Sequence, residues 1–154
     1  MAQMKGRLTK KMYNYTTFFV DHYSRLKYIH LQESSSLLQM VEVKIAFEAY
    51  ARRHGVKISH YHADNGRFAD QIFLEHIRDN HQTILYCCVN AHIQNGVTEK
   101  AIRDLKEQGR KQLIHAKARW PEVIHLSLWP YTMRNAVYIS NLMPAQEGGT
   151  SPLE

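Results

Sequence analysis

The sequence has few cysteines and no long apolar run, and both shortages limit what the chain can be. Its only two cysteines, Cys87 and Cys88, are adjacent, so they can form neither an ordinary disulfide nor a C-x-x-C metal knuckle. The longest apolar run, Ile84–Val89, is far shorter than the ~20 residues that span a bilayer. The opening residues MAQMKGRLTKK lack the apolar segment of a signal peptide. We therefore expect an intracellular protein in a reducing compartment, without membrane insertion.

The chain contains many apolar residues and an excess of basic residues. Hydrophobic residues make up 44% and aromatic residues 10% of its 154 residues, enough to bury a core, so wholesale disorder is excluded. Lysine and arginine total 20 against 14 acidic residues, which gives a formal net charge of +6. A positive charge favours a polyanionic partner, most simply nucleic acid.

Residue patterns predict strands that alternate with helices in one domain. Residues 1–12 are expected to form a loose basic lead-in, residues 13–143 a folded core, and residues 144–154 a linker. Within the core the predicted strands are 15–20, 26–31, 56–61 and 83–89, and the predicted helices are 37–53, 70–80, 98–118 and 121–142. The first two strands should form a hairpin, and Pro130 should kink the last helix. This order predicts an α/β fold, a mixed sheet with helices on its faces.

Three carboxylates stand at the ends of predicted elements. Asp21 follows the first predicted strand, Asp64 follows the third, and Glu99 lies in the first turn of the long helix. Acids at one sheet edge and one helix start can converge to hold a divalent metal ion. Taken singly, each acid is more simply explained as a turn residue or as a favourable charge at a helix start. The sequence around each acid therefore has to distinguish a metal ligand from an ordinary turn or helix-start residue.

The residues around these acids form three ordered motifs. Asp21 begins Asp-His-Tyr-Ser-Arg, Asp64 begins Asp-Asn-Gly, and Glu99 ends Gln-Asn-Gly-Val-Thr-Glu, 35 residues after Asp64. Together they resemble the catalytic core of retroviral-type integrases, most closely those of copia-type long-terminal-repeat retrotransposons, over about residues 13–154. The sequence departs from the family after Asp-Asn-Gly, where Arg-Phe-Ala replaces the usual Gly-Glu-Phe, and in residues 90–93, where the usual proline is missing.

This resemblance implies an RNase H-like fold and a DNA-joining enzyme that acts in the nucleus. The reaction would be 3′-end processing and strand transfer of retroelement DNA into target DNA. Asp21, Asp64 and Glu99 would bind two Mg²⁺ or Mn²⁺ ions. The implied partners are double-stranded DNA, a second copy in a homodimer, and flanking integrase domains of a polyprotein. Two alternatives stay open: a domesticated, non-catalytic DNA-binding module, and an RNase H-like nuclease.

The long helix carries a row of basic residues in line with Glu99. Arg103, Lys106 and Arg110 follow Glu99 at spacings that keep all four on one helix face. Taken alone, such a face is more simply a solvated surface, but its alignment with Glu99 reverses that preference and favours contact with DNA phosphates. By resemblance, Gln94 and Asn95 lie in a loop that contacts DNA.

Two further expectations concern tryptophans and apolar residues near the C-terminus. Trp120 and Trp129 are most simply core anchors. A partly exposed apolar surface is expected on the last helices and would serve as a homodimer face; it comprises Trp129, Val137, Tyr138, Ile139 and Leu142. The ten histidines are scattered and lack zinc-ligand spacing.

Overall fold

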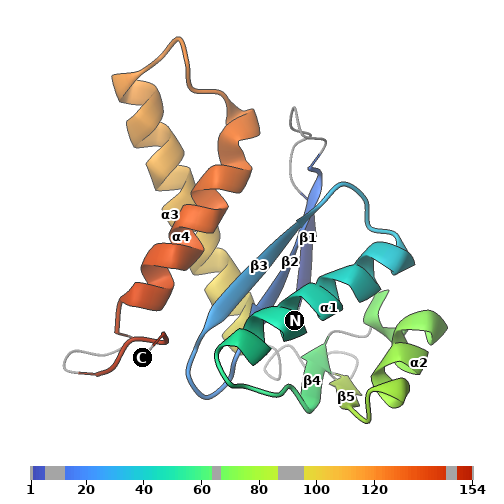
Figure 1. Ribbon diagram of the computed structural model, residues 1–154. Coiled ribbons are helices and arrows are strands. Elements are labelled where there is room, and N and C mark those ends of the chain that lie inside the picture. The colour runs from blue at the N-terminus through green and yellow to red at the C-terminus, as the bar shows by residue number, and fades with distance from the viewer. Residues whose placement is uncertain (1, 6–12, 64–66, 87–95, 145–148, 154) are drawn as a thin grey trace.

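A computed structural model describes residues 2–5, 13–63, 67–86, 96–144 and 149–153 of the chain (Figure 1). The strands are β1 (Ala2–Lys5), β2 (Tyr15–Val20), β3 (Lys27–Gln32), β4 (His60–Ala63) and β5 (Thr83–Tyr86). The helices are α1 (Leu37–Arg53), α2 (Gln71–Asp79), α3 (Gly96–Arg119) and α4 (Trp129–Leu142), with short 3-10 helices η1 (Arg67–Ala69) and η3 (Leu126–Leu128). None of the described helices is both long and apolar enough to cross a membrane.

The strands form an antiparallel sheet and a parallel pair. Strand β2 pairs with β1 on one side and β3 on the other, both antiparallel, while β4 and β5 pair in parallel. The register of the predicted hairpin sets Phe18 opposite Ile29 and Phe19 opposite Tyr28. Aromatic and β-branched residues of this kind fit a pleated, half-buried surface. The mixed α/β class predicted from the sequence is confirmed.

Two consecutive phenylalanines of β2 enter two different cores, because side chains alternate between the faces of a strand. Phe19 belongs to the first core, which is built with α1, α2 and β4 and comprises Phe19, Met40, Val43, Tyr61, Ala63, Phe68, Phe73 and Ile77. Phe18 belongs to the second core, which is built with α3 and α4 and comprises Phe18, Leu31, Leu105, Trp129, Met133, Ala136 and Val137. Helices therefore pack against both sides of β2.

The N-terminal segment differs from its predicted form. The sequence suggests a loose lead-in over residues 1–12, whereas Ala2–Lys5 forms β1, with Ala2 opposite Phe18. The segment lacks the β-branched residues that usually indicate a strand. Its backbone groups pair with β2, a partner that local sequence cannot indicate.

The third predicted strand, 56–61, begins later in the structure. The chain leaves α1 through a turn in which Gly55 has a φ of +75° and donates to the carbonyl oxygen of Arg52. Val56 is exposed. Pairing begins only at His60. The fourth predicted strand, 83–89, is described only as far as Tyr86, and it is not fully buried, since Leu85 is 69% exposed.

The last predicted helix, 121–142, is shorter in the structure. Residues 120–128 form a connector that contains η3, and α4 begins at Trp129 with Pro130 in its first turn. Proline is favoured there because the first N–H groups of a helix have no intrahelical partner. Pro130 therefore lies in the first turn of α4 and does not kink the helix. Trp129 is a core anchor as predicted, whereas Trp120 lies on the connector and is 54% exposed.

The five residues expected on a homodimer face do not share one environment. Trp129 and Val137 are buried in the second core, and Ile139 is half-buried. Tyr138 and Leu142 are exposed on α4. An apolar surface on α4 therefore remains, but it is smaller than the sequence suggests.

Candidate active site

Asp21 and Glu99, and the strand that precedes Asp64 in sequence, belong to elements found at one end of the molecule (Figure 1). Figure 1 shows the β2–β3 turn, the first turns of α3 and strand β4 at its lower end. Helix α3 packs against β2, with Leu105 and Phe18 in the same core. This packing carries the start of α3 to the end of the sheet where β2 finishes.

Asp21 organises the β2–β3 turn with its side chain. Its Oδ2 accepts hydrogen bonds from the backbone N–H groups of Tyr23 and Ser24, at 3.1 and 2.6 Å, and from the Ser24 hydroxyl at 2.8 Å. Its backbone N–H donates to the carbonyl oxygen of Leu26 at 2.9 Å. An aspartate that bonds to the backbone ahead of it is typical of turns, so the turn alone explains this residue. All three of these side-chain bonds end on Oδ2.

Glu99 lies exposed in the first turn of α3. Its neighbour Thr98 and the nearby Ala101 are buried, so the packed face of this turn is fixed and Glu99 is directed to solvent. The partial positive charge of a helix N-terminus favours a carboxylate at this position. Asp64, Gln94 and Asn95 lie outside the described residues.

A contact between two histidines joins the β2–β3 turn to β4. The rings of His22 and His62 lie 6.1 Å apart between centroids, with their planes at 65°. His22 directly follows Asp21, and His62 comes two residues before Asp64. Burial lowers the pKa of His62 from its ordinary value, which favours the uncharged ring. The structure thus brings the turn that holds Asp21 to the strand that Asp64 follows.

The basic stripe (Arg103, Lys106 and Arg110) is exposed along α3, as the sequence predicts. The adjacent helix face is buried, because Leu105 lies in the second core and Ile102 and Leu113 pack against it. This packing fixes the rotation of α3 about its own axis, and so fixes the side of the helix on which the three basic residues lie. Their exposure leaves the charged groups free to meet phosphates.

A buried polar network connects β4 to helices α1 and α2. The side chain of Lys44 is fully buried, and its Nζ lies 2.8 Å from Glu48 Oε1 and 3.0 Å from His76 Nδ1. The Tyr61 hydroxyl and the Gln82 amide each donate to the same Glu48 oxygen at 2.7 Å. These residues come from α1, α2, β4 and the turn before β5. The network therefore ties together the elements that position β4.

The same network sets the protonation of its members. Burial alone would raise the pKa of Glu48, but hydrogen bonds from Lys44, Tyr61 and Gln82 hold it below its ordinary value. Burial, together with the Glu48 carboxylate, raises the pKa of Tyr61. Burial and the neighbouring Lys44 lower the pKa of His76. A lysine ammonium has only donors, so the neutral His76 ring accepts at Nδ1.

Sequence reasoning missed this network, although part of its signal was present. Lys44 and Glu48 stand four residues apart on a helix, and Lys44 occupies an apolar position of that helix. A lysine at an apolar position with an acid one turn later can indicate a buried pair. Its partners Tyr61, His76 and Gln82 are distant in sequence and give no such indication.

The predicted acids bring the donor type that a hard divalent cation prefers, namely carboxylate oxygen. Within the part of the chain that the structure describes, no three His, Cys, Asp or Glu side chains are grouped closely enough to hold a metal. That part includes Asp21 and Glu99 but not Asp64. Both described carboxylates are exposed, and Asp21 keeps one oxygen outside its turn, so their chemistry fits Mg²⁺ or Mn²⁺.

Comparison of the sequence finds distant relatives in retrotransposons. No family model matches the chain. The chain is 28% identical over 138 residues to the retrovirus-related Pol polyprotein from transposon RE1 of Arabidopsis thaliana, and 27% identical over 135 residues to that from transposon RE2 of the same plant. These matches cover 89% and 86% of this chain. The chain spans only 9% and 8% of the length of these two polyproteins.

Comparison of the structure finds integrase cores. The structure is similar to a chain of the simian T-cell lymphotropic virus intasome in complex with PP2A regulatory subunit B56 gamma. The TM-score is 0.74 and the identity 16%, and the match covers 98% of this chain and 50% of that chain. It is similar to the HTLV-2 integrase catalytic core domain in complex with magnesium, in its dimeric form (TM-score 0.69, 16% identity, 98% and 88% coverage). It is also similar to the catalytic core domain of BIV integrase (TM-score 0.69, 18% identity, 99% and 88% coverage).

These likenesses agree with the resemblance that the three acidic motifs indicate. The structural matches cover nearly the whole chain, and the sequence matches cover most of it. The chain has the integrase catalytic core fold, which is RNase H-like, and is a distant relative of the copia-type RE1 and RE2 polyproteins.

Proposed function

We propose that this chain is the catalytic core of a retroelement integrase, which processes the 3′ ends of element DNA and joins them to target DNA. The observation that carries the proposal is the integrase core fold over 98% of the chain; the order and spacing of the acidic motifs in the sequence support it. Such an enzyme works on chromosomal DNA in the nucleus. It acts with the other domains of its polyprotein and as a homodimer.

Asp64 and Glu99, with Asp21 as the third acid, would hold two Mg²⁺ or Mn²⁺ ions at the reacting phosphate. When bound, such ions supply charge stabilisation for the attacking and leaving oxygens of a phosphodiester displacement. Glu99 is held toward solvent by the packed first turn of α3. The Oδ2 of Asp21 already binds its own turn, so variants of Asp21 need a measurement of stability beside the assay of activity.

The basic stripe would guide DNA to these acids. Arg110 lies eleven residues beyond Glu99, roughly 16 Å along the axis of α3. Over this span Arg103, Lys106 and Arg110 offer charges to successive phosphates, which positions a strand without reading its bases. Gln94 and Asn95, which precede α3, would add amide contacts to the same strand.

The test is an assay of nicking and strand transfer on labelled DNA duplexes with Mg²⁺ or Mn²⁺. Removing a metal ligand while keeping its shape should lower the rate by several orders of magnitude, so Asp64→Asn and Glu99→Gln should abolish turnover. Matched controls are Asp79→Asn on α2 and Glu122→Gln on the connector, both at exposed acids far from the acidic motifs in sequence. These two should keep the activity of the original chain.

Circular dichroism on every variant separates loss of chemistry from loss of fold. Undiminished turnover in Asp64→Asn or Glu99→Gln would remove that residue from the site. DNA binding by the unaltered chain with no metal-dependent cleavage would instead favour the non-catalytic DNA-binding module. Cleavage of the RNA strand of hybrids without DNA joining would favour the nuclease.

A further inference from the structure

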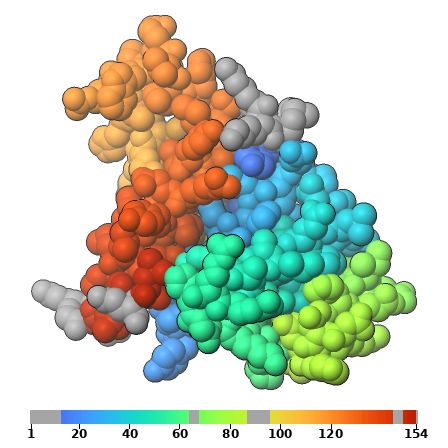
Figure 2. All heavy atoms as spheres, viewed as in Figure 1, coloured from blue at the N-terminus to red at the C-terminus, as the bar shows by residue number. Residues whose placement is uncertain are grey.

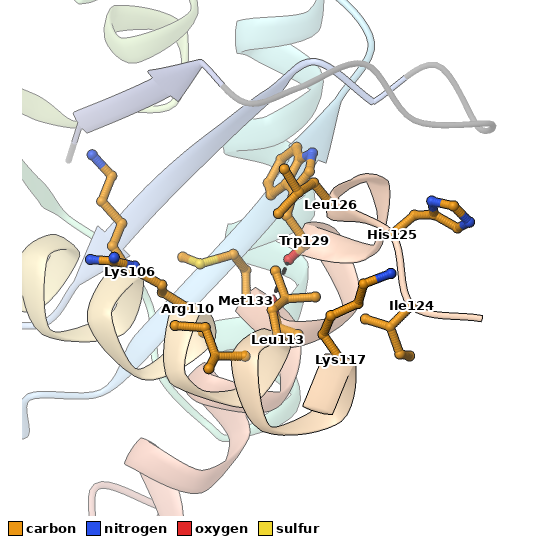
Figure 3. Close-up of a pocket in the computed structure, with 12 residues that line it drawn as sticks. Lys106, Arg110, Leu113, Lys117, Ile124, His125, Leu126, Trp129 and Met133 are labelled. Carbon is orange, nitrogen blue, oxygen red and sulfur yellow. Dashed lines mark hydrogen bonds between the residues drawn. The ribbon is translucent and has the colours of Figure 1, made fainter. Parts of the chain in front are cut away.

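Helices α3 and α4 form an open pocket near the connector, away from the acidic end of the molecule (Figure 3). Its volume is about 700 Å³. We call it the connector pocket, and it is lined by Lys106, Gly109, Arg110, Leu113, Ile114, Lys117, Ile124, His125, Leu126, Trp129, Thr132 and Met133. Three parts of the chain contribute: the second half of α3, the connector, and the first turns of α4.

The pocket follows from the way in which α3 and α4 cross. Gly109 is buried at the crossing, where a Cβ atom would come within 3.2 Å of Met133 Sδ and 3.3 Å of Thr132 Oγ1. Beyond this close approach the two helices diverge toward the connector (Figure 1). In Figure 2 this end, coloured orange, projects from the rest of the molecule. A hollow therefore opens where the helices separate, and the connector closes its far side.

The inner surface of the connector pocket is apolar and open to solvent. Ile114 and Leu126 are 54% and 57% exposed, while Leu113 and Ile124 are half-buried. Trp120, on the connector nearby, is also exposed. Exposed apolar side chains gathered around one cavity are typical of a binding surface.

The rim of the pocket carries charge of one sign. Lys106, Arg110 and Lys117 stand around the apolar side chains, and the twelve lining residues include no aspartate or glutamate (Figure 3). Lys117 is held in place, since its ammonium donates to the carbonyl oxygen of Pro121. A ligand that fills the pocket therefore meets apolar atoms inside and cations at the edge.

We propose that the connector pocket binds an acidic amphipathic peptide segment of a partner protein. Its apolar side chains would occupy the space between α3 and α4, and its carboxylates would pair with the rim cations. Charge complementarity of this kind directs association and excludes wrong partners, and apolar anchors in a groove are a common mode of peptide recognition. A second copy of this chain is a poorer fit, because its formal net charge is +6. This inference does not depend on the proposed catalysis.

The test uses the whole 154-residue chain and a synthetic helical peptide with Leu and Trp on one face and Asp and Glu beside them. Binding is measured by calorimetry and by backbone NMR shifts. A scrambled peptide of the same composition, and one with Asn and Gln in place of the acids, serve as controls. We expect the designed peptide to bind and its shifts to cluster at the lining residues. Both control peptides should bind at least about tenfold more weakly.

Variants on the protein separate this pocket from the DNA-binding surface. Leu126→Asp removes an exposed apolar side chain, and Lys117→Glu reverses a rim charge outside the basic stripe. Each should weaken peptide binding about tenfold, whereas DNA affinity should fall less than in the triple alanine variant of the basic stripe, with which the rim shares Lys106 and Arg110. The matched controls Ile45→Asp on α1 and Lys57→Glu lie at exposed positions outside the pocket and should leave peptide binding as it was.

Several results would overturn the proposal. Equal binding of the scrambled peptide, or unchanged binding by Leu126→Asp, would show that the pocket is not the site. Equal binding of a simple fatty acid such as dodecanoate would show that any anionic amphiphile suffices and that no peptide is recognised. A dimer of the unaltered chain that Leu126→Asp converts to a monomer would assign the pocket to self-association.

Discussion

At the scale of the single residue, Asp21 has a role in the turn that can be separated from a role in metal binding. Asparagine keeps an oxygen that can accept from Ser24, whereas alanine removes it. Asp21→Ala should lower the free energy of unfolding by about 1 kcal/mol through lost hydrogen bonds, and Asp21→Asn should be nearly neutral. If Asp21 also holds a metal, Asp21→Asn should abolish strand transfer at unchanged stability.

Chemical denaturation and the strand-transfer assay on the same two variants provide both measurements. Full activity of Asp21→Asn, together with destabilisation of Asp21→Ala, would restrict Asp21 to the turn. The integrase proposal would then rest on Asp64 and Glu99.

The buried Lys44–Glu48 pair makes a second residue-scale prediction. Lys44→Met removes one buried partner and leaves the Glu48 carboxylate without its cation, which should cost about 3 kcal/mol of unfolding free energy. Adding Glu48→Leu should recover part of that loss, because the uncompensated charge is removed as well. Urea denaturation of the single and double variants checks this. A double variant that is less stable than the Lys44→Met variant would contradict it.

His76 should make stability depend on pH in a known direction. Its pKa is lowered in the folded chain from 6.5, so the unfolded chain binds more protons below that pH and the folded state is disfavoured there. The contribution of the neutral His76 ring to the free energy of unfolding is therefore present above pH 6.5. It is lost as the pH falls through the folded-state pKa. The unfolding free energy should therefore fall as the pH is lowered below about 6.5.

The matched variant His76→Gln cannot titrate but keeps an oxygen that can accept from Lys44. Its unfolding free energy should vary less over the same pH range than that of the unaltered chain. An equally steep curve in both proteins would show that other groups, such as His30, whose pKa burial also lowers, cause the dependence.

At the scale of the element, the basic stripe of α3 should act through phosphates. Replacing Arg103, Lys106 and Arg110 with alanine should weaken DNA binding on all sequences alike. The slope of log K against log salt should become shallower by about 3, because that many counterions are no longer released. Fluorescence anisotropy over a salt series measures this. The same triple substitution at Arg52, Arg53 and Lys57, which are also exposed, is the control and should change the slope less.

The elements divide into those that local sequence could predict and those that it could not. Strands β2 and β3 were predictable from their aromatic and β-branched residues, and α1 from its serine cap, where Ser36 accepts from Gln39. Strand β1 was not, since Ala2–Lys5 becomes a strand only by pairing with β2. The connector was not either, because Pro121 and Pro130 both favour a helix start and local sequence does not choose between them.

The sequence motifs predicted only part of the candidate site. That Glu99 and the basic stripe share one face of α3 followed from their helical spacing. The contact between His22 and His62 depends on how the β2–β3 turn meets β4, and the residues that surround Lys44 depend on three other elements. Long-range packing of this kind has no counterpart in local sequence.

At the scale of the whole molecule, the exposed apolar residues of α4 predict self-association. Tyr138 and Leu142 are exposed within one turn of each other. Replacing both with aspartate should convert a homodimer to a monomer in sedimentation without changing the circular dichroism spectrum, since apolar surface no longer drives the contact. Leu38→Asp on α1, at another exposed leucine, is the comparison. A monomer at high concentration before any substitution would contradict the prediction.

Strand β2 has a consequence for how the molecule opens. Because Phe18 and Phe19 belong to separate cores, this one strand forms a wall of both, and neither core can loosen fully without releasing it. The amide protons of β2 should therefore exchange with solvent only in global unfolding, whereas those of the connector end should exchange through local opening. The two cores would then unfold as one cooperative unit, although they contain different helices.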